Sequence, residues 1–255
     1  LSNHNATLLK LPNFSKSIFL LDEIQSLPPR LYTFFVAYLT KFCEKFDSYA
    51  IISTATQPNF NLPKKGSNVE DIAKFFSDYK NPYKLLEHEK YFSHKIFNRY
   101  QINFDKEPID LDILRTKILT EQQSVLIILN TIDDSKDLYD LLCQDLDKSE
   151  LILLNTHFTP NDRKRKIDYL KLQLSNKRKV VAISTQLIEA GVDIDFPVLY
   201  RDFATVSSII QSAGRCNRNG KIQELGKVNL FRLINREKLR AELIYGRGKD
   251  KDILR

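Results

Sequence analysis

Glycine is scarce in this sequence of 255 residues, and methionine is absent. The seven glycines fall well below the roughly 7% of average usage, which excludes collagen-like proteins and glycine-rich linkers and leaves little room for long glycine-rich loops. The chain begins with Leu1, so we expect it to be a piece of a longer polypeptide. With 42% apolar and 28% charged residues, the composition is globular, and the length suffices for one large core or two modest ones.

The sequence also lacks the patterns of a disulfide framework, a zinc site and a membrane span. Cys43, Cys143 and Cys216 lie far apart, without a CxxC pair or a histidine at ligand spacing. No run approaches the ~18 apolar residues of a membrane span, and the N-terminus lacks the pattern of a signal peptide. We therefore expect a cytoplasmic protein in a reducing compartment, with no membrane partner.

Short apolar runs alternate with longer amphipathic segments, which is typical of βαβ units and a parallel sheet. Most of these runs are continuously apolar, as expected for strands that helices cover on both faces. The fold class is therefore predicted to be α/β. The predicted strands are Ser17–Leu21, Tyr49–Ser53, Ser124–Asn130, Leu151–Leu154, Val180–Ser184, Val198–Tyr200 and Val228–Leu233.

Helices are predicted where apolar residues recur three and four positions apart. One such stripe lies between the first two strands, on a helix that opens after Ser26, Pro28 and Pro29, and is expected to be core. Its members are Leu31, Phe34, Phe35, Tyr38, Leu39 and Phe42. Further helices are expected over Ile132–Leu146, Pro160–Leu174 and Val206–Cys216.

Residues 57–110 form a polar stretch that several prolines interrupt. It contains one plausible helix, Val69–Tyr79, and one alternating strand, Lys95–Phe104. We expect a crossover between two lobes, with a boundary near Pro108. The predicted organisation is a first lobe over 1–62, a crossover over 63–108, a second lobe over 109–240 and a tail over 241–255.

Two motifs follow the first two predicted strands. LDEIQ, Leu21–Gln25, places two adjacent carboxylates at the carboxyl end of a strand, where such a pair can hold magnesium and polarise a water or can simply form a solvated turn. STATQP, Ser53–Pro58, offers short hydroxyl donors at the next strand end and is, taken alone, a plain turn.

Two further motifs lie in the second half of the chain. STQLIEAGVDIDFP, Ser184–Pro197, combines hydroxyl, amide, glycine and carboxylate groups at a spacing that is hard to obtain by chance. QSAGRCNRNG, Gln211–Gly220, carries two arginines three positions apart. On a helix both would point the same way and clamp a phosphoryl group, or they would form a basic patch at the helix end.

The order and wording of these motifs resemble those of helicase superfamily 2, and in particular of the CRISPR-associated type I helicase. The blocks that carry the resemblance are LDEIQSLPPRLY, STATQPNF and TQLIEAGVDIDFPVLYRDFATVSSIIQSAGRCNRNG, scattered over residues 15–235. The resemblance implies RecA-like parallel sheets covered by helices, with one truncated lobe and one nearly complete lobe. Gln25 and Ser212 depart from the His and Arg that many relatives carry at these positions.

The resemblance also implies roles for individual residues. Asp22 would hold Mg²⁺ through water, and Glu23 would orient or deprotonate the attacking water. Residues that would couple the nucleotide state to strand binding are Gln25, Thr54 and Thr56. Residues that would lie near ATP are Glu189, Gly191 and Asp193, and those that would reach its γ-phosphate are Gln211, Arg215 and Arg218. Residues that would approach the nucleic-acid backbone are Asn130, Thr131, Thr185 and Gln186.

A basic segment runs from Asp162 to Lys179, where eight Lys or Arg and two Asp give a net charge of +6 within a chain of net charge +7. Its apolar positions recur at helical spacing, so the basic residues share a face that contacts phosphates or is merely solvated. Arg163 lies at its start and is a candidate phosphate contact. The preceding His157 is a candidate for the same contact or a structural residue.

Two motifs of the family are absent. No GxxxxGK followed by Ser or Thr occurs, because the Gly-Lys pairs at 220–221, 226–227 and 248–249 precede Ile, Val and Asp. In the family this phosphate loop precedes the DEIQ strand, so we expect the chain to begin after it. No His is followed by Asp, so the family's nuclease site is missing and no nuclease activity is expected.

The resemblance therefore implies a fragment of an ATP-dependent helicase that moves on single-stranded DNA and unwinds target DNA for degradation in CRISPR interference. Its cofactors would be ATP and Mg²⁺. Its partners would be single-stranded DNA, the Cascade surveillance complex and an HD nuclease domain or subunit. Two alternatives stay open: another superfamily 2 DNA or RNA helicase, and a non-catalytic nucleic-acid-binding module.

Overall fold

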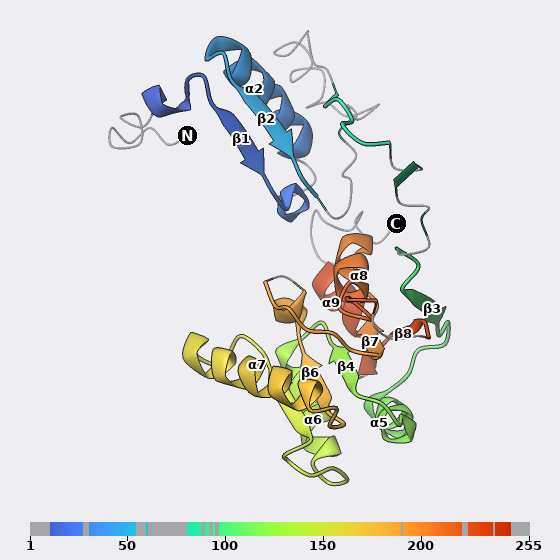
Figure 1. The fold of residues 1–255 in the computed structure, drawn as a ribbon. Helices are drawn as coiled ribbons and strands as arrows, with labels where there is room; N and C mark the ends of the chain where they lie inside the picture. Colours follow the sequence, from blue (N-terminus) through green and yellow to red (C-terminus); the bar gives the residue numbers. More distant parts are fainter. Residues whose placement is uncertain are drawn as a thin grey trace. The chain divides into compact units, whose positions relative to one another are not determined.

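The computed structural model describes residues 11–27, 31–54, 60, 81–87, 90–91, 94, 97–189, 191–220, 224–236 and 238–245. The chain divides into two compact units, residues 1–91 and 92–255 (Figure 1). The predicted helix Val69–Tyr79 lies outside the described residues.

The first unit contains two parallel strands, β1 (Ile18–Leu21) and β2 (Tyr49–Ile52), with helix α2 (Tyr32–Lys45) between them in the chain. Two short 3₁₀ helices, η1 (Leu11–Phe14) and η2 (Ile24–Ser26), flank β1. The buried side chains Ile24, Tyr32, Val36 and Phe60 form its core cluster.

The apolar stripe predicted for α2 is only partly core. Tyr32, Val36 and Ala37 are buried, whereas Leu31, Phe34 and Tyr38 are exposed. At about 100° per residue, the exposed three lie on the side of the helix opposite the buried three. Their assignment to the core is therefore wrong, because α2 is apolar on both sides and the spacing rule did not show which side is buried.

β1 and β2 are also less buried than their apolar sequences predict. Phe19 contacts Phe42 of α2, with ring centroids 5.9 Å apart, so one face of the strand pair packs on the helix. The alternate residues Ile18, Leu20 and Tyr49 are each 70% exposed. Within the described part of this unit, helical cover therefore reaches one face of the pair and not the other.

The second unit is built on a six-stranded sheet in which every pairing is parallel, in the order β3-β8-β7-β4-β6-β5. The strands are β3 (Tyr100–Phe104), β4 (Val125–Ile128), β5 (Leu151–Leu154), β6 (Val181–Ser184), β7 (Val198–Asp202) and β8 (Gly226–Phe231). The predicted α/β class is confirmed, and all residues of β4, β5, β6 and β7 are buried, as their continuous apolar runs predict.

Four helices cover the two faces of this sheet. Helices α5 (Leu111–Thr120) and α6 (Ile132–Leu142) contribute to one buried cluster, and α7 (Pro160–Ser175) and α8 (Val206–Ala213) contribute to the other. The side chains that cap their N-termini are Asp110, Thr131, Thr159 and Thr205, each of which accepts a backbone N–H two or three positions into the helix. Ile167, Leu170 and Leu174 of α7 face the core as predicted.

The edges of the second unit differ from the sequence-based expectation. β3 belongs to the six-stranded sheet, paired with β8, although the sequence places it in a crossover that ends at residue 108. Arg240 also opens a helix, α9 (Arg240–Tyr245), that follows the hairpin strands β9 (Ile234–Asn235) and β10 (Lys238–Leu239), so the expected tail after residue 240 begins as packed structure. Both segments have partners distant in the chain, β8 for β3 and Asp134 of α6 for Arg240, which local patterns do not reveal.

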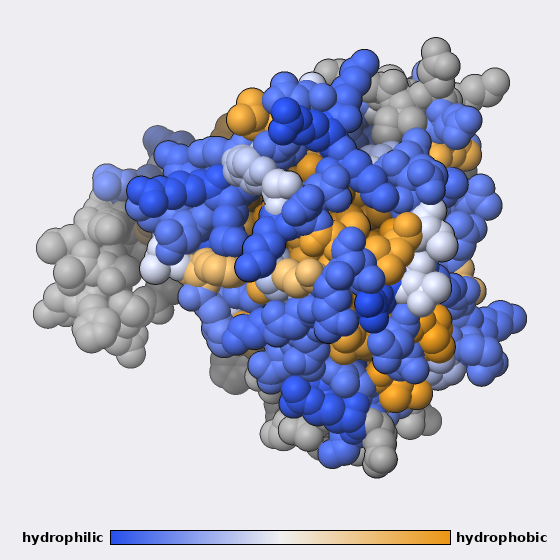
Figure 2. All heavy atoms as spheres, turned by 90° about the horizontal axis from the view of Figure 1, so that it is seen from below, coloured by the Kyte–Doolittle hydropathy of each residue, from blue (hydrophilic) through white to orange (hydrophobic). Residues whose placement is uncertain are grey.

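The described helices include none long and apolar enough to cross a membrane. Figure 2, a view from below, shows mainly hydrophilic residues with hydrophobic ones between them. The large hydrophobic residues of the second unit lie mostly in the two clusters on either side of its sheet.

Gly226 opens β8 at a point where the backbone passes close to the loop after α8. A Cβ at this position would lie 2.5 Å from the Cys216 Sγ and 3.1 Å from the Asn217 Cβ. We expect Gly226→Ala to lower the free energy of unfolding by about 1–3 kcal/mol through overpacking, as measured by chemical denaturation.

Gly220→Ala is the matched control. Its φ of +61° strains an alanine, but no atom lies within 4 Å of the new Cβ, so we expect a loss of about 1 kcal/mol. A loss at Gly226 no larger than that at Gly220 would contradict the close approach.

Candidate functional site

The carboxylate motif of the first unit lies directly after β1. Asp22 and Glu23 are exposed, and Glu23 adopts a left-handed backbone conformation with φ 56°, which is uncommon for a residue other than glycine. The Asp22 Oδ1 accepts the Glu23 backbone N–H at 3.0 Å. The turn therefore presents two adjacent carboxylates at the carboxyl end of a strand, as predicted.

Gln25 links this motif to the one that follows β2. Its Nε2 donates to the Glu23 Oε2, and its Oε1 accepts from the Thr54 Oγ1. The structure thus joins Glu23, Gln25 and Thr54 in one chain of hydrogen bonds, and Thr56 lies outside the described residues.

The carboxylates of this motif offer limited metal-binding capacity. Mg²⁺ in proteins is typically held by one or two carboxylates with waters and phosphate oxygens as its other ligands. The exposed Asp22 fits that pattern as a single ligand. The described residues include no group of three or more His, Cys, Asp or Glu side chains that would form a complete cage.

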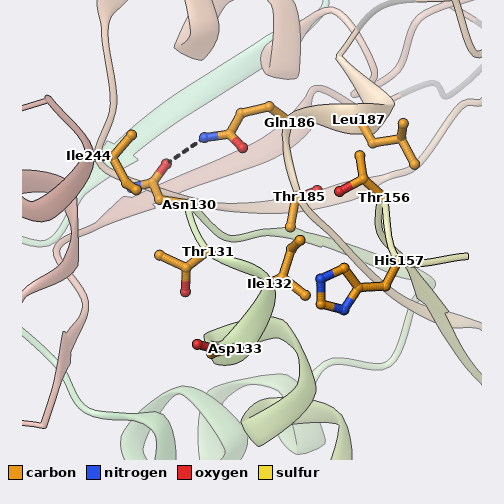
Figure 3. Close-up of a pocket in the computed structure, with 10 residues that line it drawn as sticks. All are labelled: Asn130, Thr131, Ile132, Asp133, Thr156, His157, Thr185, Gln186, Leu187 and Ile244. Carbon is orange, nitrogen blue, oxygen red and sulfur yellow. Dashed lines mark hydrogen bonds between the residues drawn. The ribbon is translucent and has the colours of Figure 1, made fainter.

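In the second unit, the loops at the carboxyl ends of β4, β5 and β6 surround a pocket of about 530 Å³ (Figure 3). Open α/β sheets bind their ligands at this edge. Most of the lining comes from these three loops, and Ile244 reaches it from α9. The lining residues are Asn130, Thr131, Ile132, Asp133, Thr156, His157, Thr185, Gln186, Leu187 and Ile244.

Asn130 makes hydrogen bonds within the protein on both sides of its amide. Its Nδ2 donates to the Asp202 Oδ2 at 2.6 Å and to the Phe203 carbonyl at 2.8 Å. Its Oδ1 accepts from Arg201 Nη1 at 2.9 Å and from Gln186 Nε2 at 3.4 Å, the bond drawn in Figure 3. Two donors and two lone pairs are thereby used, so Asn130 orients its neighbours and has little capacity left for a ligand.

The other predicted strand-binding residues differ in their exposure. Thr131 caps α6 by accepting the Asp134 backbone N–H, and Thr185 is buried at the end of β6. His157 is exposed, and its backbone N–H bonds the Asn155 Oδ1 at 3.0 Å. Arg163 is half-buried in the first turn of α7 and is not among the pocket-lining residues. The structure therefore groups Thr131, His157, Thr185 and Gln186 around one pocket.

Glu189 is buried instead of facing a ligand. Its carboxylate accepts from the Ser208 Oγ at 2.7 and 2.8 Å and from the Ser212 Oγ at 3.0 Å, and it pairs with the Arg201 Nη2 at 3.0 Å. Arg201 is itself completely buried. These contacts tie the loop after β6 to β7 and α8, so the Glu189 carboxylate, which was expected to lie near ATP, is already engaged within the protein.

Arg215 and Arg218 do not share a helix face, contrary to prediction, because α8 ends at Ala213. Arg215 is buried, and its guanidinium donates to the carbonyls of Ile188 and Glu189. It therefore holds the loop after β6 in place.

Arg218 is the more accessible of the two arginines. Its side chain is 39% exposed and its Nε lies 3.0 Å from the Oδ1 of Asp193, which is 74% exposed. Asp195 shapes the loop by accepting the backbone N–H groups of Arg218 at 2.7 Å and Asn219 at 3.1 Å.

Two predicted site residues lie close to this loop in the chain. Gln211 is in the last turn of α8, and Gly191 is exposed with φ +73°.

Sequence reasoning missed several residues that organise this edge. Arg201 and Asp202 follow the apolar residues Val198–Tyr200, the same signal of charges at a strand end that singled out Asp22 and Glu23. Ile244 and Tyr245 carry no comparable signal, because they lie in a segment expected to be a tail.

The pKa of Asp202 is raised to about 7 by burial, against the opposing effects of the Leu233 backbone N–H and the Arg201 charge. Because the ordinary value is 3.8, the folded state retains a proton that the unfolded state releases between about pH 4 and pH 7. This group therefore lowers stability progressively as the pH rises through that range.

Asp202→Asn removes this titration. We expect the wild type to lose up to about 1.4 kcal/mol of unfolding free energy per pH unit, relative to the variant, between about pH 4 and pH 7. Chemical denaturation of both proteins at several pH values measures the difference.

Asp145→Asn is the control, because the Arg115 hydrogen bond lowers the pKa of that carboxyl and moves its titration below this range. The raised pKa would be ruled out if the free energies of unfolding of the wild type and of Asp202→Asn differed by the same amount at every pH from 4 to 7.

Comparison with known proteins supplies the context of these two sites. Residues 121–221 match a family model described as "CRISPR-associated nuclease/helicase Cas3, C-terminal". The CRISPR-associated nuclease/helicase Cas3 of Methanothermobacter thermautotrophicus is 27% identical over 243 residues, which cover 92% of this chain and 27% of that protein. The protein of the same description from Haloferax volcanii is 23% identical, covering 83% of this chain and 31% of its own. The chain thus spans less than a third of these relatives.

Solved structures agree on the fold. The T. fusca Cas3–ATP structure has a TM-score of 0.63 at 15% identity and covers 89% of this chain and 32% of its own. A chain in "CRISPR RNA-guided surveillance complex, pre-nicking" also has a TM-score of 0.63, at 17% identity, covering 89% of this chain and 33% of its own. The parallel sheet flanked by helices is RecA-like, and over most of its length the chain is similar to a part of the CRISPR-associated nuclease/helicases Cas3.

Proposed function

We propose that this chain is the strand-binding and coupling part of an ATP-dependent helicase that moves on single-stranded DNA and unwinds target DNA in CRISPR interference. The observation that carries the proposal is the pocket at the carboxyl edge of β4, β5 and β6, in the same unit as the basic helix α7. The names of the relatives support the helicase role and a nuclease as partner, and the likeness to a chain of an RNA-guided surveillance complex supports such a complex as a second partner.

The chemistry of the pocket suits a phosphate backbone. Thr131, Thr156 and Thr185 carry hydroxyls at its lining, and α6 begins beside it. The N-termini of helices present backbone N–H groups and a partial positive charge to anions. Asp133 is the carboxylate of the lining, so phosphates should lie toward Thr156 and Thr185.

The charge that attracts DNA lies on α7. Lys164, Arg165 and Lys171 are exposed on this helix. Lys166 differs, because its ammonium lies 4.4 Å from the centroid of the Phe158 ring and burial lowers its pKa. The exposed three therefore provide the sequence-independent electrostatic attraction to phosphates.

The nucleotide-facing residues of the first unit fit a coupling role. When bound with ATP, Mg²⁺ would neutralise phosphate charge, and Asp22 offers it a carboxylate. Gln25 holds the carboxylate of Glu23 and the hydroxyl of Thr54 through opposite ends of one amide. A shift of Glu23 therefore changes the position of Thr54 after the neighbouring strand.

Removing one exposed charge from α7 tests the DNA-binding role. For Lys164→Ala we expect weaker binding of a fluorescent oligo(dT) and a decrease of about 0.7 in the slope of log K against log salt, the effect of one lost phosphate contact on a single strand. Fluorescence anisotropy at several salt concentrations measures both.

Lys227→Ala is the matched control, since Lys227 is exposed on β8 and lies outside α7 and the pocket. Equal effects at the two lysines would indicate general charge attraction and not a binding face. Tighter binding of oligo(U) than of oligo(dT) would favour the RNA helicase alternative.

The absence of a phosphate loop from the sequence leads to a second expectation. We expect this chain to hydrolyse ATP at a negligible rate with or without oligo(dT). In helicases that have a phosphate loop, its backbone amides and lysine bind the β- and γ-phosphates of ATP, and the sequence lacks these groups. A phosphate-release assay measures this, and DNA-stimulated turnover at the rate of a complete motor would overturn it.

A further inference from the structure

One residue that lines the strand-binding pocket, Ile244, comes from the segment Ile234–Tyr245, which follows the central sheet in the chain. It consists of the hairpin strands β9 and β10 and the helix α9. Ile244 of α9 lines the pocket, and Figure 3 shows it next to Asn130. This segment carries none of the motifs of the sequence.

A buried ion pair anchors α9 to α6. The Arg240 Nε donates to the Asp134 Oδ2 at 2.8 Å, and both side chains are almost fully buried. Asn235 Nδ2 donates to the other oxygen, Asp134 Oδ1, at 2.7 Å, and the Arg240 backbone N–H donates to the Leu233 carbonyl at 2.9 Å. Buried charges with this many partners fix geometry, since a displaced partner would leave Asp134 uncompensated.

The end of α9 contacts Gln186. The Gln186 Nε2 donates to the Tyr245 hydroxyl at 3.2 Å and to the Asn130 Oδ1 at 3.4 Å. The orientation follows from the groups behind it: the Phe203 carbonyl can only accept and the Arg201 guanidinium can only donate, so Asn130 donates from its Nδ2 and its Oδ1 accepts from both Arg201 and Gln186. Gln186 must then present its N–H groups to Asn130 and Tyr245, which leaves its carbonyl oxygen to face elsewhere.

We propose that α9, anchored to α6, fixes the geometry of the strand-binding pocket. Its Tyr245 is a positioning residue that orients the Gln186 amide toward the bound strand. The terminal torsion of a glutamine is broad, so a single hydrogen bond to Asn130 would leave the amide free to rotate. The second bond, to Tyr245, restricts it. The nature of the strand rests on the proposed function, whereas the contact between Tyr245 and Gln186 does not.

Tyr245→Phe removes the hydroxyl and keeps the ring. We expect the Gln186 side-chain NH₂ resonances to shift in a ¹H–¹⁵N spectrum of the full chain without DNA, and the thermal midpoint to stay unchanged. Binding of oligo(dT) should weaken about fivefold, the effect of one ordinary hydrogen bond. Gln186→Ala identifies the resonances by their disappearance.

A double-mutant cycle distinguishes positioning from direct contact. In a Gln186→Ala background, Tyr245→Phe should have no further effect on the Kd for oligo(dT), because Tyr245 acts through Gln186. Tyr200→Phe is the matched control, since it removes a hydroxyl that bonds Glu121. We expect it to leave the Kd unchanged.

The possible outcomes separate the two proposals. If the wild type binds no oligo(dT), the proposed function fails, and the NMR spectrum still decides the contact. Unchanged Gln186 resonances in Tyr245→Phe, or additive losses in the cycle, would overturn the positioning role.

Discussion

The buried guanidinium of Arg201 is the constraint on which the carboxyl edge of the second unit depends. It bonds the Ile128 carbonyl at the end of β4, the Asn130 side chain, the Ser208 hydroxyl of α8 and the Glu189 carboxylate. One cation thereby sets the relative positions of two strands, a helix and the loop after β6. A buried arginine needs such a set of partners, because an uncompensated charge in the interior is strongly destabilising.

Polar residues that the sequence assigned to the site of the second unit fall into two groups with different tasks. Glu189, Asn130 and Arg215 are buried and bond to the protein itself, so they hold the loops in place. His157 and Arg218 are more accessible and carry the groups that a ligand can reach. Motifs in the sequence mix the two groups, since both consist of polar side chains that follow an apolar strand or the helix α8.

Local patterns predicted much of the fold. Continuous apolar runs marked β4 to β8 within a few residues, and helical spacing marked α6, α7 and α8 but not α5. What they could not predict depends on contacts distant in the chain. α8 stops at Ala213 because the chain then pairs with the segment before β7 through a bridge between Phe196 and Cys216, and this turn separates Arg215 from Arg218.

The candidate site shows the same division. Strand-end motifs singled out polar residues after β4 and β6, and parallel strands bring these carboxyl ends to one edge of the sheet. They did not indicate that Asn130 and Glu189 would bond inward, because burial of a polar side chain depends on partners such as Arg201. Tyr245 was missed because nothing near it in the sequence marks it.

The pairing of β3 with β8 bears on the order in which the chain can fold during synthesis. β3 is an edge strand whose one neighbour in the sheet is β8, and Asn103 lies 126 positions before its partner Asn229. β8 also separates β3 from β7, so β3 has no place in the sheet until the last of its strands has left the ribosome. Closing so long a loop is entropically costly and slow. β3 is therefore the first strand of the six-stranded sheet to be synthesised and the last to pair with a neighbour.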